Sequence, residues 1–453
     1  MACPARDERT LREHALEVFR AAVAAADPAG AVRRHVELRG NTLVVRTPEG
    51  PVEVALPDGA AGRVFVIGAG KASAVMARAL EELLDGRIAG GLVCVKDGHG
   101  VPLERVEVAE ASHPVPDARG VEAARRVLEL VSGAGEGDLI LSVLSGGGSA
   151  LLTLPAEGLT LEDLQEVTDL LLASGATIGE INALRKHLSQ VKGGRLAAAA
   201  HPARVVNLVL SDVIGDRLDV IASGPFAPDP STYADARAVL ERYGLWDRAP
   251  AGVRRVLEEG ASGRMPETPK PGDPRLERVV QVVVASNRVS LGAAAERARR
   301  MGYRVLVLSS RIQGEAREVA RVLAAIAQEI RESGQPLSPP ACVLAGGETT
   351  VTLRGGGRGG RNQELALALA LELEGWEGIV GLSGGTDGTD GPTDAAGGVA
   401  TPATAGRARA LGLDPMDHLE RNDSYTLLDA TGDLVRTGPT RTNVMDVQVL
   451  LVA

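Results

Sequence analysis

The stretch GRVFVIGAGKASAVMARALEELL, residues 62–84, decides the fold class. Its apolar run predicts a buried strand, its glycines predict a tight turn, and the helical spacing of the next apolar residues predicts a helix. The same order of strand, polar or glycine turn and helix recurs along most of the chain. Apolar strands that alternate with helices are typical of parallel α/β sheets that are buried on both faces.

On the N-terminal side of this stretch, residues 6–25 predict an amphipathic helix and residues 41–56 a β-hairpin turning at 47–50. The alternation continues through residues 90–216 and resumes at residue 278. Between the two runs, PETPKPGDP (residues 266–274) is proline-rich and predicts a linker. The simplest organisation is therefore two α/β domains, residues 1–245 and 275–453, joined by a linker region at 246–274.

The composition excludes several classes of protein. The 453 residues carry a formal net charge of −10 and only 2% aromatic residues, which argues against nucleic-acid binding. No apolar run reaches the roughly 18 residues that a membrane span requires. The three cysteines, Cys3, Cys94 and Cys342, are far apart, which fits a reducing compartment without disulfides. We therefore expect a soluble, cytoplasmic protein.

The first candidate site is the turn VIGAGKAS, residues 66–73. Gly68 and Gly70 permit a tight turn before a helix, and Lys71 adds a positive charge where the helix amides would attract an anion. The turn is a weak dinucleotide motif, because Ser73 stands where G-x-G-x-x-G requires its third glycine, and it does not match a Walker A motif. We expect Lys71 and the amides of this turn to bind phosphate. A plain strand–helix turn with an exposed lysine is the alternative.

The next glycine turn, LSVLSGGGSALL (residues 141–152), follows another predicted strand. It does not match the G-x-S-x-G motif of serine hydrolases, since Leu151 takes the second glycine position. A backbone nest for phosphate or carboxylate fits better, although a loop that only avoids steric clashes remains possible. The residues of this nest are Ser145, Gly146, Gly147, Gly148 and Ser149.

Charged residues cluster in two further segments of the first half. Asn182, Arg185 and Lys186 share one face of a predicted helix and predict an anion-binding surface, unless that face is simply solvated. Asp212 and Asp216 follow a strand, where a carboxylate can hold Mg²⁺ or accept a proton, or else cap a helix.

The second half carries its own cluster of charges. Arg358 and Arg361 lie among glycines directly before an apolar helix, which predicts a second anion site. In GGTDGTDGPTDAAGG (residues 384–398), Asp387, Asp390 and Asp394 stand on a flexible backbone. Carboxylates near cationic anion sites suit Mg²⁺–phosphate binding or the positioning of a substrate hydroxyl. An Asx-turn would account for one of the three aspartates but not for all.

Taken together, these segments resemble the glycerate 2-kinase family, whose members carry a MOFRL domain. The matches span residues 66–451 and include VIGAGKAS, SHPVPD, LSGGGSALL, INALRKHLSQVKGGRLA, GGETTVT, GGRNQELALALAL, GTDGTDGPTDAAG and GPTRTNVMDVQVLL. The SHPVPD segment contains His113, for which a structural role is at least as plausible as a catalytic one. Glu348 of GGETTVT joins the candidate binding residues.

The resemblance implies ATP-dependent phosphorylation of D-glycerate to 2-phosphoglycerate with Mg²⁺. It also implies a Rossmann-like N-terminal domain, a MOFRL-like C-terminal α/β domain and a cleft between them. Lys71 and Arg361 match the cleft residues proposed for the family. We assign catalytic roles to Lys71, Arg361, Asp212 and Asp387, and a metal to Asp387 and Asp390.

Two other functions remain open. A hydroxypyruvate reductase would need an NAD(P)H site, and a non-catalytic sugar-acid or nucleotide sensor would bind the same ligands without turnover. A homo-oligomer is also possible.

Overall fold

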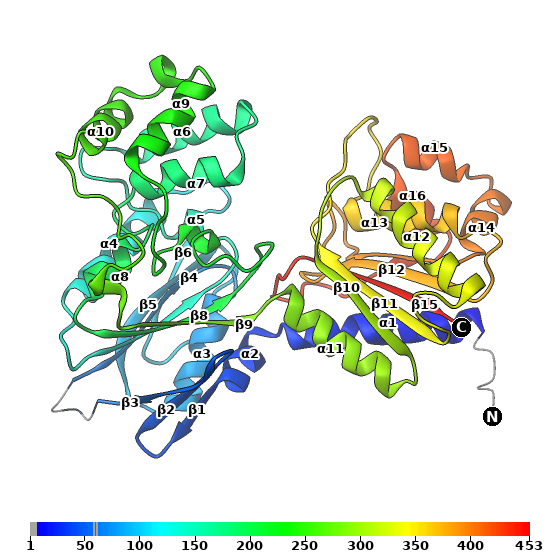
Figure 1. Cartoon of the computed structure of the whole chain (residues 1–453), viewed down its shortest axis with the longest axis horizontal. Helices are drawn as coiled ribbons and strands as arrows, with labels where there is room; N and C mark the ends of the chain where they lie inside the picture. Colours follow the sequence, from blue (N-terminus) through cyan, green and yellow to red (C-terminus); the bar gives the residue numbers. More distant parts are fainter. Residues whose placement is uncertain (1–6, 58, 60–61) are drawn as a thin grey trace. The chain divides into compact units, whose positions relative to one another are not determined.

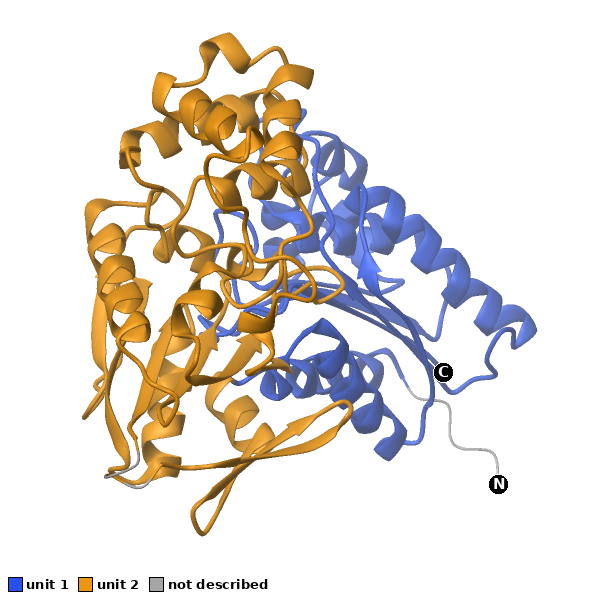
Figure 2. Cartoon of the chain, turned by 60° about the vertical axis from the view of Figure 1, so that its left-hand side comes forward, with its two compact units in different colours: residues 1–27, 285–453 blue, residues 28–284 orange. Residues whose placement is uncertain are grey.

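The computed structural model describes residues 7–57, 59 and 62–453, which form two compact units (Figure 2). Unit 2 is Pro28–Val284, and unit 1 joins Met1–Asp27 to Ala285–Ala453. This division differs from the expected boundaries at both ends of the first domain. The N-terminal helix belongs with the second half of the chain, and residues 246–284 belong with the first half.

A six-stranded sheet forms the centre of unit 2, in the order β6-β5-β4-β7-β8-β9. Its strands are β4 (Val64–Ala69), β5 (Ile88–Lys96), β6 (Glu107–Ala111), β7 (Leu139–Leu144), β8 (Arg204–Leu210) and β9 (Val279–Ala285). The pairs from β6 to β8 are all parallel, as the alternation predicts. The glycine turns after β4 and β7 therefore lie at one edge of this sheet.

Helices cover the sheet of unit 2 and form a second group beyond its carboxyl edge (Figure 1). Buried residues of α4 and α8 pack on one face of the strands. The other group has its own core, built from α6, α7, α9 and α10. The helices are α2 (Pro28–His35), α3 (Ser73–Leu84), α4 (Ala118–Ser132), α5 (Gly148–Leu151), α6 (Leu161–Ala173), α7 (Ile178–His187), α8 (Arg195–Ala200), α9 (Tyr233–Arg242) and α10 (Ala251–Ala261).

The predicted hairpin is confirmed. It belongs to a three-stranded antiparallel sheet of β1 (Val36–Arg39), β2 (Thr42–Thr47) and β3 (Gly50–Ala55), and Thr47 pairs with Gly50 at the turn.

The region expected to link the domains is packed into unit 2 instead. Helix α10 buries Val253, Val256 and Leu257. A Cβ on Gly260 would lie 2.2 Å from the ring of Tyr233, so the two helices touch there. In the proline-rich stretch, Glu267 accepts a hydrogen bond from the amide of Tyr233 at 2.9 Å. Prolines prevent a helix here without making the segment free of the fold.

Unit 1 contains a second six-stranded sheet, in the order β10-β11-β15-β12-β13-β14. Its strands are β10 (Arg304–Ile312), β11 (Ala341–Gly347), β12 (Ile379–Gly385), β13 (Gly397–Ala400), β14 (Leu434–Val435) and β15 (Asp446–Val452). Only β10 and β11 pair in parallel, and the other pairs are antiparallel. The α/β class expected for this domain is confirmed, and its sheet is mixed: the last strand inserts antiparallel between β11 and β12, and β13 and β14 add antiparallel beyond β12.

Both faces of this sheet are covered. Helices α12 and α13 pack on one face, and α1 and α11 on the other (Figure 1). The helices are α1 (Glu8–Ala25), α11 (Asn287–Arg300), α12 (Ala316–Ser333), α13 (Arg361–Glu372), α14 (Thr404–Ala410), α15 (Pro415–Glu420) and α16 (Ser424–Ala430).

The predicted N-terminal helix is α1, and its apolar stripe explains its place in unit 1. Leu11, Val18 and Phe19 are fully buried in a core shared with α11 and the last strands of the sheet. Burial of such side chains typically stabilises a fold by about 1.5–3 kcal/mol each. Periodicity predicts that this stripe must be covered but does not identify the partner.

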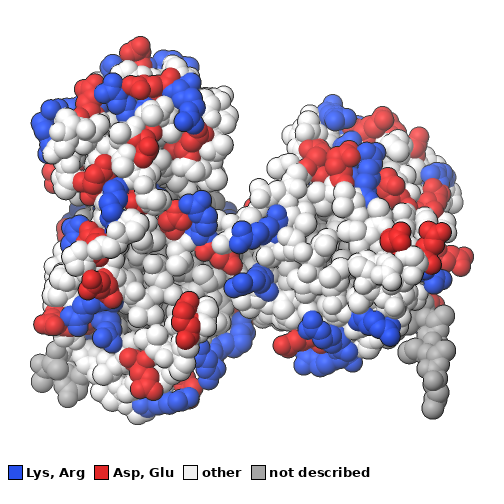
Figure 3. All heavy atoms as spheres, viewed as in Figure 1, with Lys and Arg blue, Asp and Glu red and all other residues white. Residues whose placement is uncertain are grey.

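Basic and acidic side chains are interspersed on the visible surface of each unit (Figure 3). In the described part of the chain, no helix is both long and apolar enough to cross a membrane. Cys94 and Cys342 are buried free thiols, and Cys3 lies outside the described residues.

Candidate active site

Two glycine turns meet at the carboxyl edge of the first sheet. The amide of Lys71 donates to the carbonyl of Gly146 at 2.9 Å, and the amide of Ala72 donates to Oγ of Ser145 at 3.0 Å. The amides at positions 70 and 73 also donate to carbonyls of the protein. The expectation that the amides of this first turn bind phosphate is therefore wrong, because the second turn already occupies them. The Lys71 side chain remains as the candidate group.

Close packing explains the glycines of the first turn. A Cβ on Gly68 would lie 2.2 Å from the carbonyl oxygen of Val143, and a Cβ on Gly70 would lie 2.2 Å from Oγ of Ser145. Gly70 also has a φ of +134°, which side chains rarely allow. Ser73 is fully buried and donates its hydroxyl to Val143. These positions bring the two strand ends together.

The second turn keeps the features of an anion nest. Within the described part of the chain, the amides of Gly146 and Gly147 donate to no protein acceptor. A Cβ on Gly146 would lie 2.2 Å from Oδ2 of Asp212. A Cβ on Gly147 would lie 3.0 Å from Cδ2 of His113 and 3.6 Å from Cε of Lys71. Three side chains from distant segments thus gather around two unpaired amides.

His113 is a neutral member of this group. Burial, together with the charges of Lys71, Lys96 and His99, lowers the pKa of His113 to about 4. At neutral pH its imidazole therefore serves as a donor or acceptor of hydrogen bonds and not as a cation. The sequence left His113 open between structural and catalytic roles, and its place beside Gly147 favours a role in the site.

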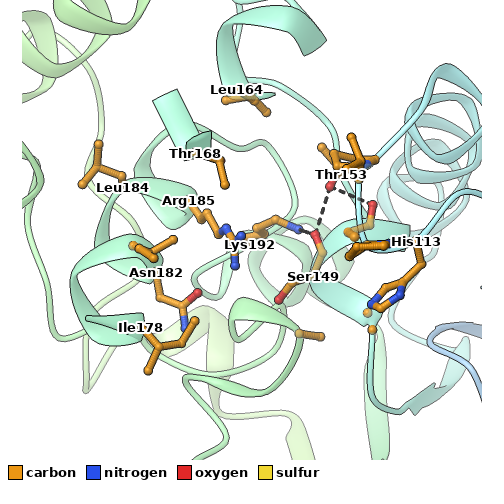
Figure 4. A pocket seen from close by; sticks show the side chains of 18 of the residues that line it. His113, Ser149, Thr153, Leu164, Thr168, Ile178, Asn182, Leu184, Arg185 and Lys192 are labelled. Carbon is orange, nitrogen blue, oxygen red and sulfur yellow. Dashed lines mark hydrogen bonds between the residues drawn. The ribbon is translucent and has the colours of Figure 1, made fainter. Parts of the chain in front are cut away.

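Two cations line a cavity of about 430 Å³ next to this nest (Figure 4). Burial lowers the pKa of Arg185, which has no hydrogen-bond or ion-pair partner among the described residues. Lys192 is 3% exposed, and its Nζ donates to the carbonyls of Ser149, at 2.8 Å, and of Leu152. Burial, with the nearby charge of Arg185, lowers the pKa of Lys192 to about 7. Largely buried cations without a carboxylate partner are the usual mark of an anion site.

Polar groups connect α7 to the nest. Oγ of Ser149 lies 2.9 Å from Oγ of Ser223, which donates to Oδ1 of Asn182 at 3.3 Å. Asn182 and Ser149 both line the cavity, as does Gly148. The helix face predicted from the sequence therefore lines the cavity through Asn182 and Arg185, and Asn182 connects it to the nest.

Lys186 has a different role from the one expected. Its Nζ lies 3.2 Å from the fully buried carboxylate of Asp229 and 3.6 Å from Asp219. Lys186 is itself 4% exposed and does not line the cavity. It therefore neutralises a buried carboxylate within the helical part of unit 2 instead of binding a ligand.

In unit 1, Arg361 begins helix α13 and is held by two carboxylates. Its Nε and Nη2 donate to Asp446 at 2.7 and 3.0 Å, and its Nη1 donates to Glu348 at 2.8 Å. Burial would lower the pKa of Arg361, but the hydrogen bonds and charges of these partners raise it above its ordinary value. Burial raises the pKa of Glu348.

The antiparallel insertion of β15 creates this cluster. Asp446 is the first residue of β15 and pairs in register with Gly347 at the end of β11 and with Gly385 at the end of β12. The start of one strand thus lies beside the carboxyl ends of two others, next to Glu348 and close to Asp387. An all-parallel sheet would place the first residue of β15 at the opposite edge.

The three aspartates of the GGTDGTDGPTD loop separate into different roles. Asp390 is 3% exposed and accepts hydrogen bonds from the amides of Asn362 and Gln363, at 3.1 and 2.9 Å, so it caps α13. Burial raises its pKa to about 6. Asp394 is exposed and pairs with Arg436 at 3.1 Å. Asp387 lies close enough to the Arg361 cluster that its charge raises the pKa values of Glu348 and Asp446. Asp390 is also near, since its charge contributes to the raised pKa of Arg361, but its oxygens are occupied by the amides of α13.

Few side chains in this region could ligate a metal ion. No group of three or more His, Cys, Asp or Glu side chains that could hold an ion occurs among the described residues. Magnesium in kinase sites is usually held by one or two carboxylates together with substrate phosphates. Asp387, whose Oδ1 accepts one hydrogen bond from the amide of Thr389 at 3.1 Å, fits such a partial site. Asp390 does not, since both its oxygens accept backbone amides.

Arg358 lies away from the Arg361 cluster. Its guanidinium stacks on the ring of Tyr425, 4.1 Å from the ring centre, and its amide donates to Asp423 at 3.0 Å. The side chain is exposed, and the stacking leaves its donors available for an anion.

Sequence reasoning missed two residues of these sites. Asp446 is a lone carboxylate at the start of a mainly apolar strand, and Lys192 is one of only five lysines in the chain. Because lysines are rare in this chain, the presence of one at position 192 could have indicated a specific role. For Asp446 the signal was the cost of burying a charge in a central strand without a partner.

Comparisons with known proteins agree with this architecture. Residues 14–258 match the family described as "Domain of unknown function (DUF4147)", and residues 341–446 match the MOFRL family. The crystal structure of glycerate kinase from Thermotoga maritima superimposes with a TM-score of 0.87 at 43% identity, covering 98% of this chain and 100% of that chain.

Sequence relatives extend along nearly the whole chain. Glycerate 2-kinase of Pyrococcus horikoshii is 42% identical, over 98% of this chain and 97% of its own length. A protein of Agrobacterium vitis that carries the name "Putative hydroxypyruvate reductase" is 45% identical, over 96% of this chain and 93% of its own length. Fold and site thus define a two-unit α/β protein with a MOFRL domain. The chain belongs to the glycerate 2-kinase family.

Proposed function

We propose that the protein is a kinase that transfers the terminal phosphoryl group of ATP to D-glycerate, giving 2-phosphoglycerate. The observation that carries this proposal is the gathering of Lys71, His113 and Asp212 around the unpaired amides of Gly146 and Gly147. Positioning and charge neutralisation provide most of the catalysis in phosphoryl transfer. Amides and a lysine at one point suit the phosphate oxygens, and an adjacent carboxylate suits the attacking hydroxyl.

Each unit would contribute distinct groups. In unit 2, Lys71 and the two amides would stabilise phosphate charge. In unit 1, Arg361 would bind the transferring phosphoryl group or the glycerate carboxylate through the donors that Asp446 and Glu348 leave open. Asp212 or Asp387 would orient the hydroxyl and accept its proton. A cleft between the units, with closure that excludes water, stays a prediction.

Mg²⁺ would be held by Asp387 together with the phosphates of ATP, and it would neutralise charge on those phosphates. ATP itself follows from the proposed kinase activity. A cytoplasmic location and a homo-oligomer also remain predictions. Two buried free cysteines support the former.

Phosphorus NMR tests the proposal directly. The protein is incubated with ATP, Mg²⁺ and D-glycerate, and the product is compared with authentic 2- and 3-phosphoglycerate. Formation of 2-phosphoglycerate supports the proposal. Formation of the 3-isomer refutes its regiochemistry, and consumption of neither substrate refutes the activity.

Hydroxypyruvate reductase is a second candidate because a relative carries that name. The first turn argues against it, since Ser73 stands in place of the third glycine of a dinucleotide motif and is fully buried. Oxidation of NADH or NADPH by hydroxypyruvate, without ATP consumption on glycerate, would favour this candidate. Binding of ATP and glycerate without turnover would favour a sensor.

A further inference from the structure

The cavity beside the nest has walls that the reaction with glycerate does not explain. The largest apolar part of its lining comes from α6 and α7 (Figure 4). The main apolar residues are Leu164, Leu171, Leu172, Ile178, Ile181 and Leu184. Leu172 and Ile178 are each 59% exposed. Large apolar side chains exposed on a cavity wall favour a ligand that removes them from water.

The charged end of the same cavity lies toward the glycine turn. Figure 4 shows the Arg185 and Lys192 side chains together, between Asn182 and Ser149. Gly146 and Gly147 line the cavity too, so their unpaired amides belong to this end. Asp212 also lines it, and Asp169 stands exposed on α6. Arg185 pairs with neither carboxylate. The cavity thus joins an apolar compartment to a cationic one.

A ligand that fits both compartments needs an apolar, flat part and a multiply charged anionic part. Glycerate has three carbons, two that carry hydroxyls and a third that is the carboxylate carbon itself, so it offers almost no apolar surface. A nucleoside triphosphate has both parts, a base and a chain of phosphates. The volume of about 430 Å³ lies within the range usual for small-molecule sites, roughly 300–1,000 Å³.

We propose that this cavity binds the nucleotide, with the base between α6 and α7 and the phosphates at Arg185, Lys192 and the Gly146–Gly147 amides. The inference rests on the proposed kinase function and assigns the nucleotide to unit 2. The base then provides affinity through apolar contact, and the cations orient the phosphates. Glycerate does not enter the apolar compartment.

Calorimetric titration of two probes separates the compartments. ADP carries base and phosphates, and inorganic tripolyphosphate carries phosphates alone. The double variant Leu172→Asn, Ile178→Asn makes the wall polar without adding charge, at positions exposed enough to keep the fold. Val322→Asn is the matched control, since Val322 is 60% exposed on α12 of unit 1. Arg185→Met removes the cation and keeps the apolar stem.

The proposal predicts a distinct response for each variant. The double wall variant weakens ADP binding about tenfold through lost apolar contact and leaves tripolyphosphate binding unchanged within about twofold. Arg185→Met weakens both probes about tenfold or more. Val322→Asn changes neither. In steady-state assays the wall variant raises the KM for ATP and leaves the KM for glycerate unchanged.

Two outcomes overturn the inference. If the double wall variant binds ADP unchanged, the base does not bind in this cavity. If the variant raises the KM for glycerate and leaves the KM for ATP unchanged, the cavity binds glycerate instead. Failure of the proposed function is distinguishable, because ADP and tripolyphosphate binding are measured without glycerate. If the variants show the predicted pattern of binding but the protein does not phosphorylate glycerate, the nucleotide site is supported and the proposed kinase activity is wrong.

Discussion

Arg361 and Asp446 form a two-pronged ion pair, with Nε–Oδ2 at 2.7 Å and Nη2–Oδ1 at 3.0 Å. Asp446 is fully buried at the start of β15, so the strand fixes the plane of the guanidinium. Glu348 holds the third nitrogen. The candidate phosphoryl-binding arginine is thus oriented by a carboxylate that lies 85 residues away in the sequence.

The first prediction concerns this pair. Asp446→Asn keeps the shape of the side chain but removes its charge, so Arg361 loses its fixed orientation. We expect kcat to fall about 10- to 100-fold, because a small misplacement of a positioning group has effects of this size. We also expect Arg361→Ala and the double variant to lose activity to a similar extent, because both residues act as one unit. Additive losses would contradict the coupling.

Asp387 and Asp390 provide a matched pair in one loop. Asp390→Ala leaves buried amides of α13 without an acceptor, so we expect the free energy of unfolding to fall by about 2–3 kcal/mol. Asp387→Ala should change it by less than about 0.5 kcal/mol and lower kcat about 100-fold or more. Urea denaturation and steady-state assays measure both quantities. If both variants lose activity only to the extent that they unfold, Asp387 has no role in the site.

Lys71 and Lys186 also differ in role, since Lys71 is a candidate for phosphate binding and Lys186 stabilises the fold. Lys71→Ala should reduce kcat/KM about 100-fold or more and leave the melting temperature unchanged, because Lys71 stands at the nest. Lys186→Met leaves the buried carboxylate of Asp229 without its nearest cation and should reduce stability by about 3–5 kcal/mol. Thermal unfolding and initial rates distinguish the two effects. Normal turnover in Lys71→Ala rejects the phosphate role.

The pH dependence of stability reports on Lys192. Its pKa is about 7 in the fold against 10.5 ordinarily, so between these values the unfolded chain binds more protons than the folded one. The free energy of unfolding should therefore rise with pH across this window, and the cost of the buried charge should be fully present below pH 7. Lys192→Met should flatten this rise, as measured by urea unfolding at pH 7 and pH 9. If the free energy of unfolding of Lys192→Met still rises with pH as in the unaltered protein, a group other than Lys192 titrates in this window.

Local patterns predicted much of the first unit. Strand, turn and helix follow one another as expected from residue 62 to residue 210, and the parallel pairing of β4 to β8 agrees. In the turn of residues 145–149, for which an anion nest is predicted, the amides of Gly146 and Gly147 are unpaired among the described residues, whereas those of Ser145 and Gly148 donate to carbonyls of the protein; anion binding there stays a prediction. The glycines of the first turn were interpreted incorrectly. Their residue type reveals close approach but not whether a ligand or another strand approaches.

The fold class, the family and the segments that carry the charged residues follow from the sequence, because local apolar patterns and glycine motifs are enough to specify them. Which of these charges are paired depends on tertiary packing, because a buried cation is neutralised by whichever carboxylate the packing brings near it. Lys186 meets Asp229 and is a structural group, whereas Arg185, the residue directly before it on α7, has no such partner among the described residues and remains available to a ligand. Strand order likewise decided the partner of Arg361, since only the antiparallel entry of β15 brings Asp446 to that edge of the sheet.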